Sequence, residues 1–330
     1  MTKEKIDTKK INELLEADNT LRPKKFTDFV GQKKILNNLL VMIEAAKKRE
    51  EHLDHVLFYG PPGIGKTTVA HIIANEIGSN LKITSGPAIT RAGDLASILT
   101  NLEENDVLFI DEIHRLTKNV EETIYPAMED FAIDIIIGKG PSARTVRLDL
   151  PKFTLVGATT KIGNISNPLR DRFGAVFRLD YYTDDELSKI LKRSAKIMML
   201  ELDQALAMQI AKRARGTPRI ANRILKRMRD YSEVHQKDLN KSFVDEILSF
   251  LGIDEFGLES EDIKYLRVLN EKFKNGPAGL STLSAALSED EHTVEEVIEP
   301  YLIKLGLVRK TTTGRTLTDF AVNMLNKKSV

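Results

Sequence analysis

The chain has 330 residues, of which 42% are hydrophobic and 29% are charged, so we expect a soluble globular protein of two or three domains. Its net charge of +1 gives no general affinity for a polyanion, and its lack of cysteine excludes disulfides, thiolate metal sites and cysteine nucleophiles. No apolar run reaches the roughly 18 residues of a membrane span and Met1–Lys5 has no apolar signal-peptide core, which predicts a cytoplasmic protein without a membrane partner.

The first residues suggest an arm followed by a helix. Residues 1–20 mix Lys, Glu, Asp and Asn, which favours a flexible N-terminal arm. The chain is not expected to be helical before Pro23. An apolar stripe then predicts a helix from about Lys33 to Lys48.

The run Gly60–Thr68 fits the phosphate-binding loop pattern G-x-x-x-x-G-K-[ST] at every fixed position. It follows the apolar run Val56–Tyr59, typical of a buried strand, and precedes a helical pattern over Val69–Ile77. A strand, a glycine-rich turn and a helix place backbone N–H groups and the positive end of a helix dipole around an anion. We expect Lys66, on an exposed loop, to reach the terminal phosphates and Thr67 to hold Mg²⁺. A glycine-rich turn that binds no ligand would need neither the strand before it nor the helix after it.

A second part of the site is predicted after a short strand, Leu81–Thr84, and a helix, Ala92–Asn101. The apolar run 107–110 reads as a buried parallel strand that ends in Asp111 and Glu112. Ligands bind at the carboxyl ends of strands in open α/β sheets. Asp111 is therefore predicted to bind Mg²⁺ through water, and Glu112 to orient and activate the attacking water.

Residues 133–150 predict a hairpin inserted into the α/β pattern, with strands at 133–137 and 146–150 around Gly138–Pro141. It is either a plain hairpin or a docking site. Its isoleucines, among them Ile136 and Ile137, exceed what a lone hairpin buries. The next buried strand, from Phe153, ends in Thr159 and Thr160, and a hydroxyl there can touch the γ-phosphate or the attacking water.

A loop at 169–174 presents Arg170 and Arg172. In a ring, one of them would act as an arginine finger at the nucleotide of the next subunit. Spacing alone does not choose between them, or exclude a pair of solvated arginines. The six histidines show no metal-ligand spacing and are interpreted as ordinary core or surface residues.

The pattern becomes helical after Tyr182. Thr183 and Glu186 form a capping box, and further helices are predicted at about 203–215, 218–231 and 241–251. Thr217 is suited to be an N-cap with Pro218 at the first helical position, which aims Arg219 back across the domain junction. This segment reads as a small helical bundle.

The last segment predicts a winged helix. Helices are expected near 261–274, 281–287 and 293–305, the last opened by a Thr293–Glu296 capping box and ended by Gly306. Two short strands at 307–310 and 315–318 would form the wing. Its Arg309, Lys310 and Arg315 suit phosphate contacts, or are ordinary exposed basic residues.

Several runs together resemble the RuvB family, the AAA+ motor of bacterial Holliday-junction branch migration. These runs are Leu21–Pro23, Gly60–Thr68, Asp111–Leu116, Tyr125–Asp130, Gly157–Thr160, Pro168–Gly174 and Arg215–Arg223. After the N-terminal arm (1–20), the resemblance implies three parts: an AAA+ α/β ATPase domain with a parallel sheet (21–182), a helical lid (183–254) and a winged-helix DNA-binding domain (255–330). It also implies a homohexameric ring on duplex DNA that works with RuvA and the RuvC resolvase in recombination and repair.

The resemblance assigns roles residue by residue. Lys66, Glu112, Thr159 (the sensor after the strand) and Arg172 (the arginine finger) would serve catalysis, and Thr67 and Asp111 would hold Mg²⁺. The ATP or ADP contacts would be Leu21, Arg22, Gly63, Gly65, Lys66, Thr67, Thr68, Glu129, Asp130, Phe131, Arg172, Tyr182 and Arg219, the last as second sensor. The hairpin at 133–150 matches the element that docks RuvA.

The wing departs from the family pattern. The family usually has Thr-Pro-Arg-Gly-Arg, whereas this chain has Thr311-Thr312-Thr313-Gly314-Arg315 and so lacks one proline and one arginine. Arg309 beside Lys310 can compensate for the lost charge. Two other functions are compatible with the loop: a clamp loader or another AAA+ ATPase that remodels protein, and a nucleotide-gated DNA-binding switch. Glu112 argues against the switch, which needs no water-activating base.

Overall fold

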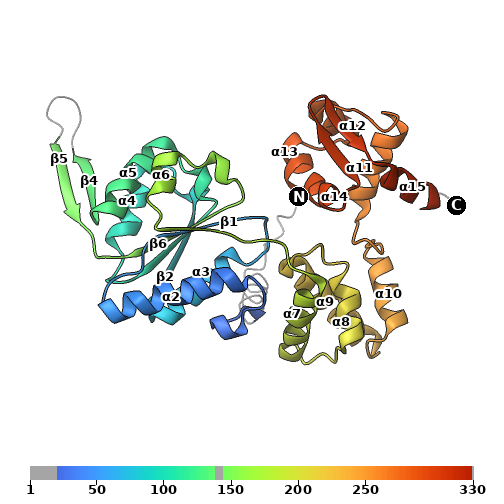
Figure 1. Ribbon diagram of the computed structural model, residues 1–330, viewed down its shortest axis with the longest axis horizontal. Coiled ribbons are helices and arrows are strands. Elements are labelled where there is room, and N and C mark those ends of the chain that lie inside the picture. Colours follow the sequence, from blue (N-terminus) through green and yellow to red (C-terminus); the bar gives the residue numbers. More distant parts are fainter. Residues whose placement is uncertain (1–20, 138–143, 329–330) are drawn as a thin grey trace, which may run out of the picture. The chain divides into compact units, whose positions relative to one another are not determined.

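The computed structural model describes residues 21–137 and 144–328 (Figure 1). The predicted arm, residues 1–20, and the hairpin tip, Gly138–Pro141, lie outside the described residues. The chain forms two compact units. The first contains the described residues up to Met199 together with Thr217–Asn222, and the second contains Leu200–Gly216 and the chain from Arg223 onward.

The first unit is built on a parallel sheet with the strand order β2-β3-β6-β1-β7. The strands are β1 (Val56–Tyr59), β2 (Leu81–Ser85), β3 (Val107–Asp111), β6 (Thr154–Thr159) and β7 (Ala175–Arg178). Every residue of β6 is buried, as are the first four of β3, because helices cover both faces of the sheet. The predicted α/β class with a parallel sheet is confirmed.

Helices α2 (Lys33–Arg49) and α3 (Lys66–Ile77) lie on one side of this sheet, and α4 (Ala92–Thr100), α5 (Lys118–Glu129) and α6 (Asn167–Asp171) on the other (Figure 1). Short 3₁₀ turns occur at Phe26–Asp28, Gly86–Ala88, Ile113–Arg115 and Ile162–Asn164. Helix α7 (Asp184–Ile197) also belongs to this unit, and its predicted capping box of Thr183 and Glu186 is present.

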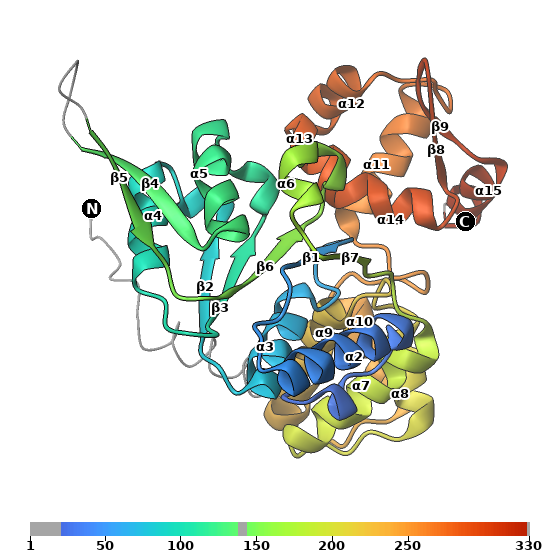
Figure 2. The same cartoon turned by 60° about the vertical axis from the view of Figure 1, so that its left-hand side comes forward.

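The predicted hairpin is present as β4 (Ala132–Ile137) and β5 (Arg144–Asp149), paired antiparallel with Ile133 opposite Leu148. Both views show it projecting from the α/β unit (Figures 1 and 2). Ile133 is buried at its base, whereas Val146 and Leu148 are 38% and 37% exposed. The hairpin therefore anchors in the core and presents apolar side chains farther out.

The second unit starts with α8 (Gln204–Ala211), and α10 (Lys241–Phe250) follows α9 (Pro218–His235), whose first residues belong to the first unit. Helix α8 ends four residues before the predicted end at 215. Arg215 and Gly216 then adopt left-handed backbone conformations, with φ of 57° and 74°.

The winged-helix part contains α11 (Ser260–Glu271), α12 (Leu280–Leu287), α13 (Glu291–Thr293), a π-helical turn (Val294–Ile298) and α14 (Glu299–Lys304). The wing strands are β8 (Val308–Thr311) and β9 (Gly314–Leu317), and α15 (Asp319–Lys328), which was not predicted, follows them. The predicted cap at Thr293 is wrong, because Asp290 is the N-cap and accepts the Thr293 N–H. None of the described helices is long and apolar enough to cross a membrane.

Candidate active site

Three strand ends meet at one edge of the sheet. The glycine-rich loop follows β1, Asp111 ends β3, and Thr159 ends β6, which lies between β1 and β3. The Gly60 N–H donates to the Thr159 carbonyl at 3.2 Å, which joins the loop to the middle strand. Because all three strands are parallel, the predicted phosphate loop, acidic pair and sensor position share the edge where ligands bind.

The loop has the backbone of an anion cradle. Gly63 and Gly65 have φ of 75° and 105°, and α3 begins directly afterwards at Lys66. A Cβ on Gly63 would lie 2.8 Å from Cγ2 of Thr217 and 3.0 Å from Cβ of Arg219. Glycine is therefore required for both its conformation and the close packing, and the helix N-terminus is aimed into the loop. These features fit a nucleotide phosphate.

Lys66 is buried, with 8% of its surface exposed, so the expectation of an exposed lysine is wrong. Its Nζ donates to the carbonyl oxygens of Gly60 and Pro61, each at 2.8 Å. Burial lowers the pKa of Lys66 to about 8, although Asp111 acts in the opposite direction. The ammonium group lies in the loop, where incoming phosphate oxygens can replace the two carbonyls.

The acidic pair is held by an unusual backbone. Glu112 has a left-handed φ of 47°, and its N–H donates to Oδ1 of Asp111 at 2.9 Å. The Glu112 carboxylate lies 3.3 Å from Nη1 of Arg115. Left-handed conformations of residues other than glycine are strained and cluster at functional sites.

Thr67 and Asp111 are the candidate ligands for a magnesium ion. Within residues 21–137 and 144–328, no group of three or more His, Cys, Asp or Glu side chains could hold a metal ion. Mg²⁺ in nucleotide sites is normally bound by one or two protein oxygens together with phosphates and water. Thr67 and Asp111 fit that donor set.

His114 contacts Thr159, which the sequence did not lead us to expect. Its Nδ1 lies 2.9 Å from Oγ1 of Thr159, which is fully buried. Thr159 also accepts the Lys161 N–H. His114 is therefore not an isolated surface residue, and its position two residues beyond Glu112 was the available signal.

Three of the other predicted nucleotide contacts lie at the loop and α3, whereas Leu21 is buried and its carbonyl accepts from Arg193 of α7. Arg22 lies 3.0 Å from Nε2 of His71 on α3. The Tyr182 hydroxyl donates to the Ile64 carbonyl at 3.1 Å, and the Arg219 N–H donates to the Gly63 carbonyl at 3.3 Å. These residues approach the loop from segments far apart in the sequence.

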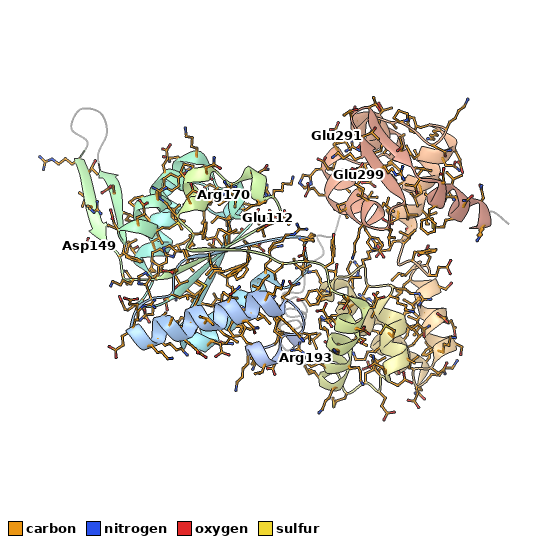
Figure 3. The ribbon with its side chains drawn as sticks, viewed as in Figure 1. Glu112, Asp149, Arg170, Arg193, Glu291 and Glu299 are labelled. Carbon is orange, nitrogen blue, oxygen red and sulfur yellow. The ribbon has the colours of Figure 1, made fainter. Side chains whose placement is uncertain are left out.

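Arg172 is engaged within its own chain. Its Nη2 lies 3.1 Å from Oε2 of Glu129, its Nη1 donates to the Pro168 carbonyl at 2.7 Å, and its guanidinium lies 4.4 Å from the Tyr125 ring centroid. Asp130 pairs with Arg147 of the hairpin at 2.8 Å, and Phe131 packs edge-on against His52. The segment 129–131 thus contacts Arg172 and the hairpin base. Arg170, labelled in Figure 3, donates instead to Asn167.

The three predicted DNA contacts differ in their surroundings. Arg309 is exposed, and Lys310 pairs with Glu295 at 2.6 Å. Arg315 is 7% exposed, and its Nε donates to Glu299 at 2.7 Å, to which the Tyr265 hydroxyl also donates at 3.0 Å. Because the Arg315 guanidinium is committed to Glu299, a phosphate contact by Arg315 requires a rearrangement and stays a prediction.

The fold and the site together define a P-loop ATPase that carries a lid and a winged helix. Sequence models of three domains match in order: the Holliday junction DNA helicase RuvB P-loop domain at residues 21–179, the RuvB AAA lid domain at 182–254 and the RuvB C-terminal winged helix domain at 255–326. The chain belongs to the RuvB family, a family of AAA+ ATPases.

Individual relatives agree with this assignment. The Holliday junction branch migration complex subunit RuvB of Campylobacter hominis is 57% identical over 314 residues, covering 95% of this chain and 92% of that protein. The solved Thermotoga maritima RuvB Holliday junction branch migration motor is 47% identical, with a TM-score of 0.84 over 93% of this chain and 98% of that one. A substituted variant of the same Thermotoga protein matches at 48% identity and a TM-score of 0.85.

Proposed function

We propose that this chain is the ATP-driven motor of Holliday-junction branch migration in recombination and repair, acting in the cytoplasm as a homohexameric ring on duplex DNA. RuvA and the RuvC resolvase are its proposed partners. The observation that carries the proposal is the joining of one phosphate loop, one strained acidic pair and one winged helix in a single chain of the RuvB family.

The residues divide the work of hydrolysis. Bound ATP and Mg²⁺ would supply the phosphoanhydride bond and the charge that polarises it. The N–H groups of the loop and Lys66 would bind and orient the phosphates, and Thr67 and Asp111 would hold the ion. Glu112 accepts a hydrogen bond from the attacking water and orients it, while Thr159 and His114 hold the strand end behind it. Arg219 would respond to the bound nucleotide through the hydrogen bond from its backbone N–H to the Gly63 carbonyl.

A ring would complete this site. Arg172, Glu129 and Tyr125 form one cluster, so Arg172 is already occupied within its own subunit. In the proposed ring this cluster faces the nucleotide of the neighbouring subunit. That arrangement would also bring Glu129, Asp130 and Phe131 to the neighbour's nucleotide.

The hairpin is the proposed RuvA contact. Val146 and Leu148 of β5 are partly exposed apolar side chains two residues apart on one strand, which gives a partner apolar surface to cover. The substitutions Val146→Ser and Leu148→Ser should weaken RuvA binding without lowering basal ATP turnover. Undiminished RuvA binding after replacement of the hairpin by a short turn would contradict this assignment.

The decisive experiment is branch migration on a synthetic four-way junction, with and without RuvA. We expect ATP-dependent migration that RuvA stimulates, and its loss in Glu112→Gln, which should still bind ATP but turn it over on the order of 10²–10⁴ times more slowly. A remodelling ATPase that acts on protein would show no stimulation of turnover by junctions. A nucleotide-gated switch would show no steady-state turnover at all.

A further inference from the structure

The run Arg215–Arg219 is divided between the two compact units. Thr217 and Arg219 belong to the first unit, where a Cβ on Gly63 of the phosphate loop would contact both of them. Arg215 and Gly216 belong to the second unit. Whatever Arg215 contacts is therefore linked covalently, within four residues, to a segment that touches the nucleotide site.

Arg215 is bound to the winged-helix domain. Its Nη2 pairs with Asp262 at 2.5 Å and lies 3.6 Å from Glu259, and its Nε donates to the Gly257 carbonyl at 2.8 Å. Its guanidinium also lies 4.9 Å from the ring centroid of Tyr301. The Arg215 and Asp262 side chains are 12% and 3% exposed, so this is a largely buried ion pair with further hydrogen bonds.

The contact reaches two helices of that domain. Asp262 accepts the N–H of Glu259 and so caps α11, while Lys304 of α14 donates to the backbone carbonyl of Arg215 at 3.2 Å. Burial raises the pKa of Asp262, and the charge of Arg215 opposes that effect. Removal of the guanidinium would leave the carboxyl group buried without its main partner.

The backbone between Arg215 and Arg219 has little freedom. Arg215 and Gly216 are both left-handed, and Pro218 restricts its own φ at the start of α9. A Cβ on Gly257 would lie 2.7 Å from the Arg213 carbonyl, so the chain entering this turn is also packed closely against the winged-helix domain. The segment between Arg215 and Arg219 is therefore short and restricted in its backbone conformations.

We propose that Arg215 is a positioning residue that couples the nucleotide state to the winged-helix domain. A shift of Arg219 on nucleotide exchange moves Gly216 and Arg215, and Arg215 carries α11 and α14 with it. The wing then holds duplex DNA differently in the ATP and ADP states. This proposal rests on the proposed function, since it presupposes a DNA-bound ATPase.

The test is a measurement of linkage. The Kd for a short duplex is measured with ADP and with a non-hydrolysable ATP analogue, and the Kd of each nucleotide is measured with and without DNA. Coupled sites must affect each other by the same factor, commonly about 5–150-fold. In Arg215→Lys, which keeps the charge but loses the planar fork, and in Arg215→Ala, we expect that factor to fall to about one. Basal turnover and the Kd for DNA with ADP should stay within about twofold of wild type.

Arg213→Ala is the matched control. Arg213 is 18% exposed, lies two residues earlier and pairs with Asp245 on α10, so its side chain is held inside the helical bundle. It should keep the wild-type coupling factor. Asp262→Asn provides a second, milder variant if Arg215→Ala does not fold, and thermal melting identifies the folded variants.

The outcomes are distinct. The proposal is overturned if folded Arg215→Lys and Asp262→Asn keep the coupling factor of the wild-type protein. It is also overturned if Arg213→Ala loses as much coupling as the Arg215 variants, or if the wild-type protein itself has a coupling factor of one. If the wild-type protein hydrolyses ATP but does not bind duplex or junction DNA, the proposed function itself fails. Loss of coupling confined to the Arg215 and Asp262 variants supports the role of Arg215.

Discussion

The hydroxyl of Thr159, at the end of β6, lies 2.9 Å from Nδ1 of His114. His114 stands two residues after Glu112 on the loop that leaves β3, and β3 and β6 are neighbouring strands. This hydrogen bond joins Thr159, the proposed sensor, to the loop that carries Glu112, the proposed water-orienting carboxylate. A group that must point at a reacting atom depends on such supporting contacts.

His114→Ala should therefore slow the ATPase without weakening nucleotide binding. Loss of one hydrogen bond of about 1 kcal/mol that positions Glu112 corresponds to roughly a fivefold fall in kcat. Steady-state turnover and ADP titration measure the two effects separately. His114→Asn keeps a polar group near the position of Nδ1 and should recover part of the loss. Equal turnover in wild type and His114→Ala would show that the bond only stabilises the fold.

The buried lysine of the phosphate loop predicts a pH dependence. Because the pKa of Lys66 is lowered to about 8, the nucleotide-free protein loses this charge as the pH rises above 8. The phosphates favour the charged form, so ATP binding should take up a proton at pH 9 and none at pH 6.5. Calorimetry in two buffers of different ionisation enthalpy measures this uptake. Lys66→Arg, whose guanidinium does not titrate in this range, should abolish it.

The same shift affects folding of the nucleotide-free chain. An unfolded lysine keeps its proton to a pKa of about 10.4. Between about pH 8 and 10.4 the unfolded state binds more protons than the folded state, so the Lys66 contribution to the free energy of unfolding rises with pH across that range. Denaturation of wild type and Lys66→Arg over this range should diverge with that sign. An uptake of protons when ATP binds to the wild-type protein at pH 6.5 would contradict the lowered pKa of Lys66.

Local patterns predicted the segments that converge at the edge of the sheet, because each segment is contiguous in the chain. The loop Gly60–Thr68 carries its own context, and the apolar run before Asp111 reads as a strand buried on both faces. Edge strand β7 was missed because it is short and only partly buried. The Thr293 cap failed for a local reason: Asp290, three residues earlier, binds the Thr293 N–H at 2.8 Å and starts the helix sooner.

What the sequence could not predict depends on residues distant in the chain. Arg172 forms an ion pair with Glu129, 43 residues away, and Arg315 forms one with Glu299 on another element. No periodicity or motif records such pairs. The burial of Lys66 likewise follows from the folded loop around it and not from its position in the pattern.

Arg172 should act on the nucleotide of a neighbouring subunit. Arg172→Ala should keep ATP binding and lose about 10³–10⁵ in kcat, the usual effect of an arginine finger. Lys66→Ala subunits have an intact arginine finger and a defective phosphate loop. A mixture of Arg172→Ala and Lys66→Ala subunits should therefore regain ATPase activity. Only an interface between an Arg172→Ala loop and a Lys66→Ala arginine has both parts intact.

The control for the Arg172→Ala substitution is Arg170→Ala, which removes the neighbouring, partly buried arginine bonded to Asn167. It should turn over ATP at close to the wild-type rate. Mixed rings that assemble but show only the sum of the two mutant activities would mean that Arg172 acts within its own subunit or is structural. Arg170 would then be the next candidate.

The wing carries an ion pair that would compete with DNA in the proposed function. Lys310 lies 2.6 Å from Glu295 of the preceding helical segment, and both side chains are nearly half exposed. Glu295 also lies 3.7 Å from Arg315. A phosphate that binds Lys310 must displace this carboxylate or approach close to it. The free protein thus reduces the positive potential of its own wing.

Glu295→Gln should therefore bind duplex DNA several-fold more tightly at low salt, because Lys310 loses an ionic partner and the phosphates lose a repelling charge. The gain should shrink as ionic strength rises, since exposed charges are screened over about 10 Å at 0.1 M salt. Fluorescence anisotropy over a salt series measures both effects. Glu291→Gln, at an exposed glutamate on α13 (Figure 3), removes the same charge outside the pairs with Lys310 and Arg315. Equal gains in the two variants would show a general charge effect, whereas a gain confined to Glu295→Gln assigns the competition to the Glu295–Lys310 pair.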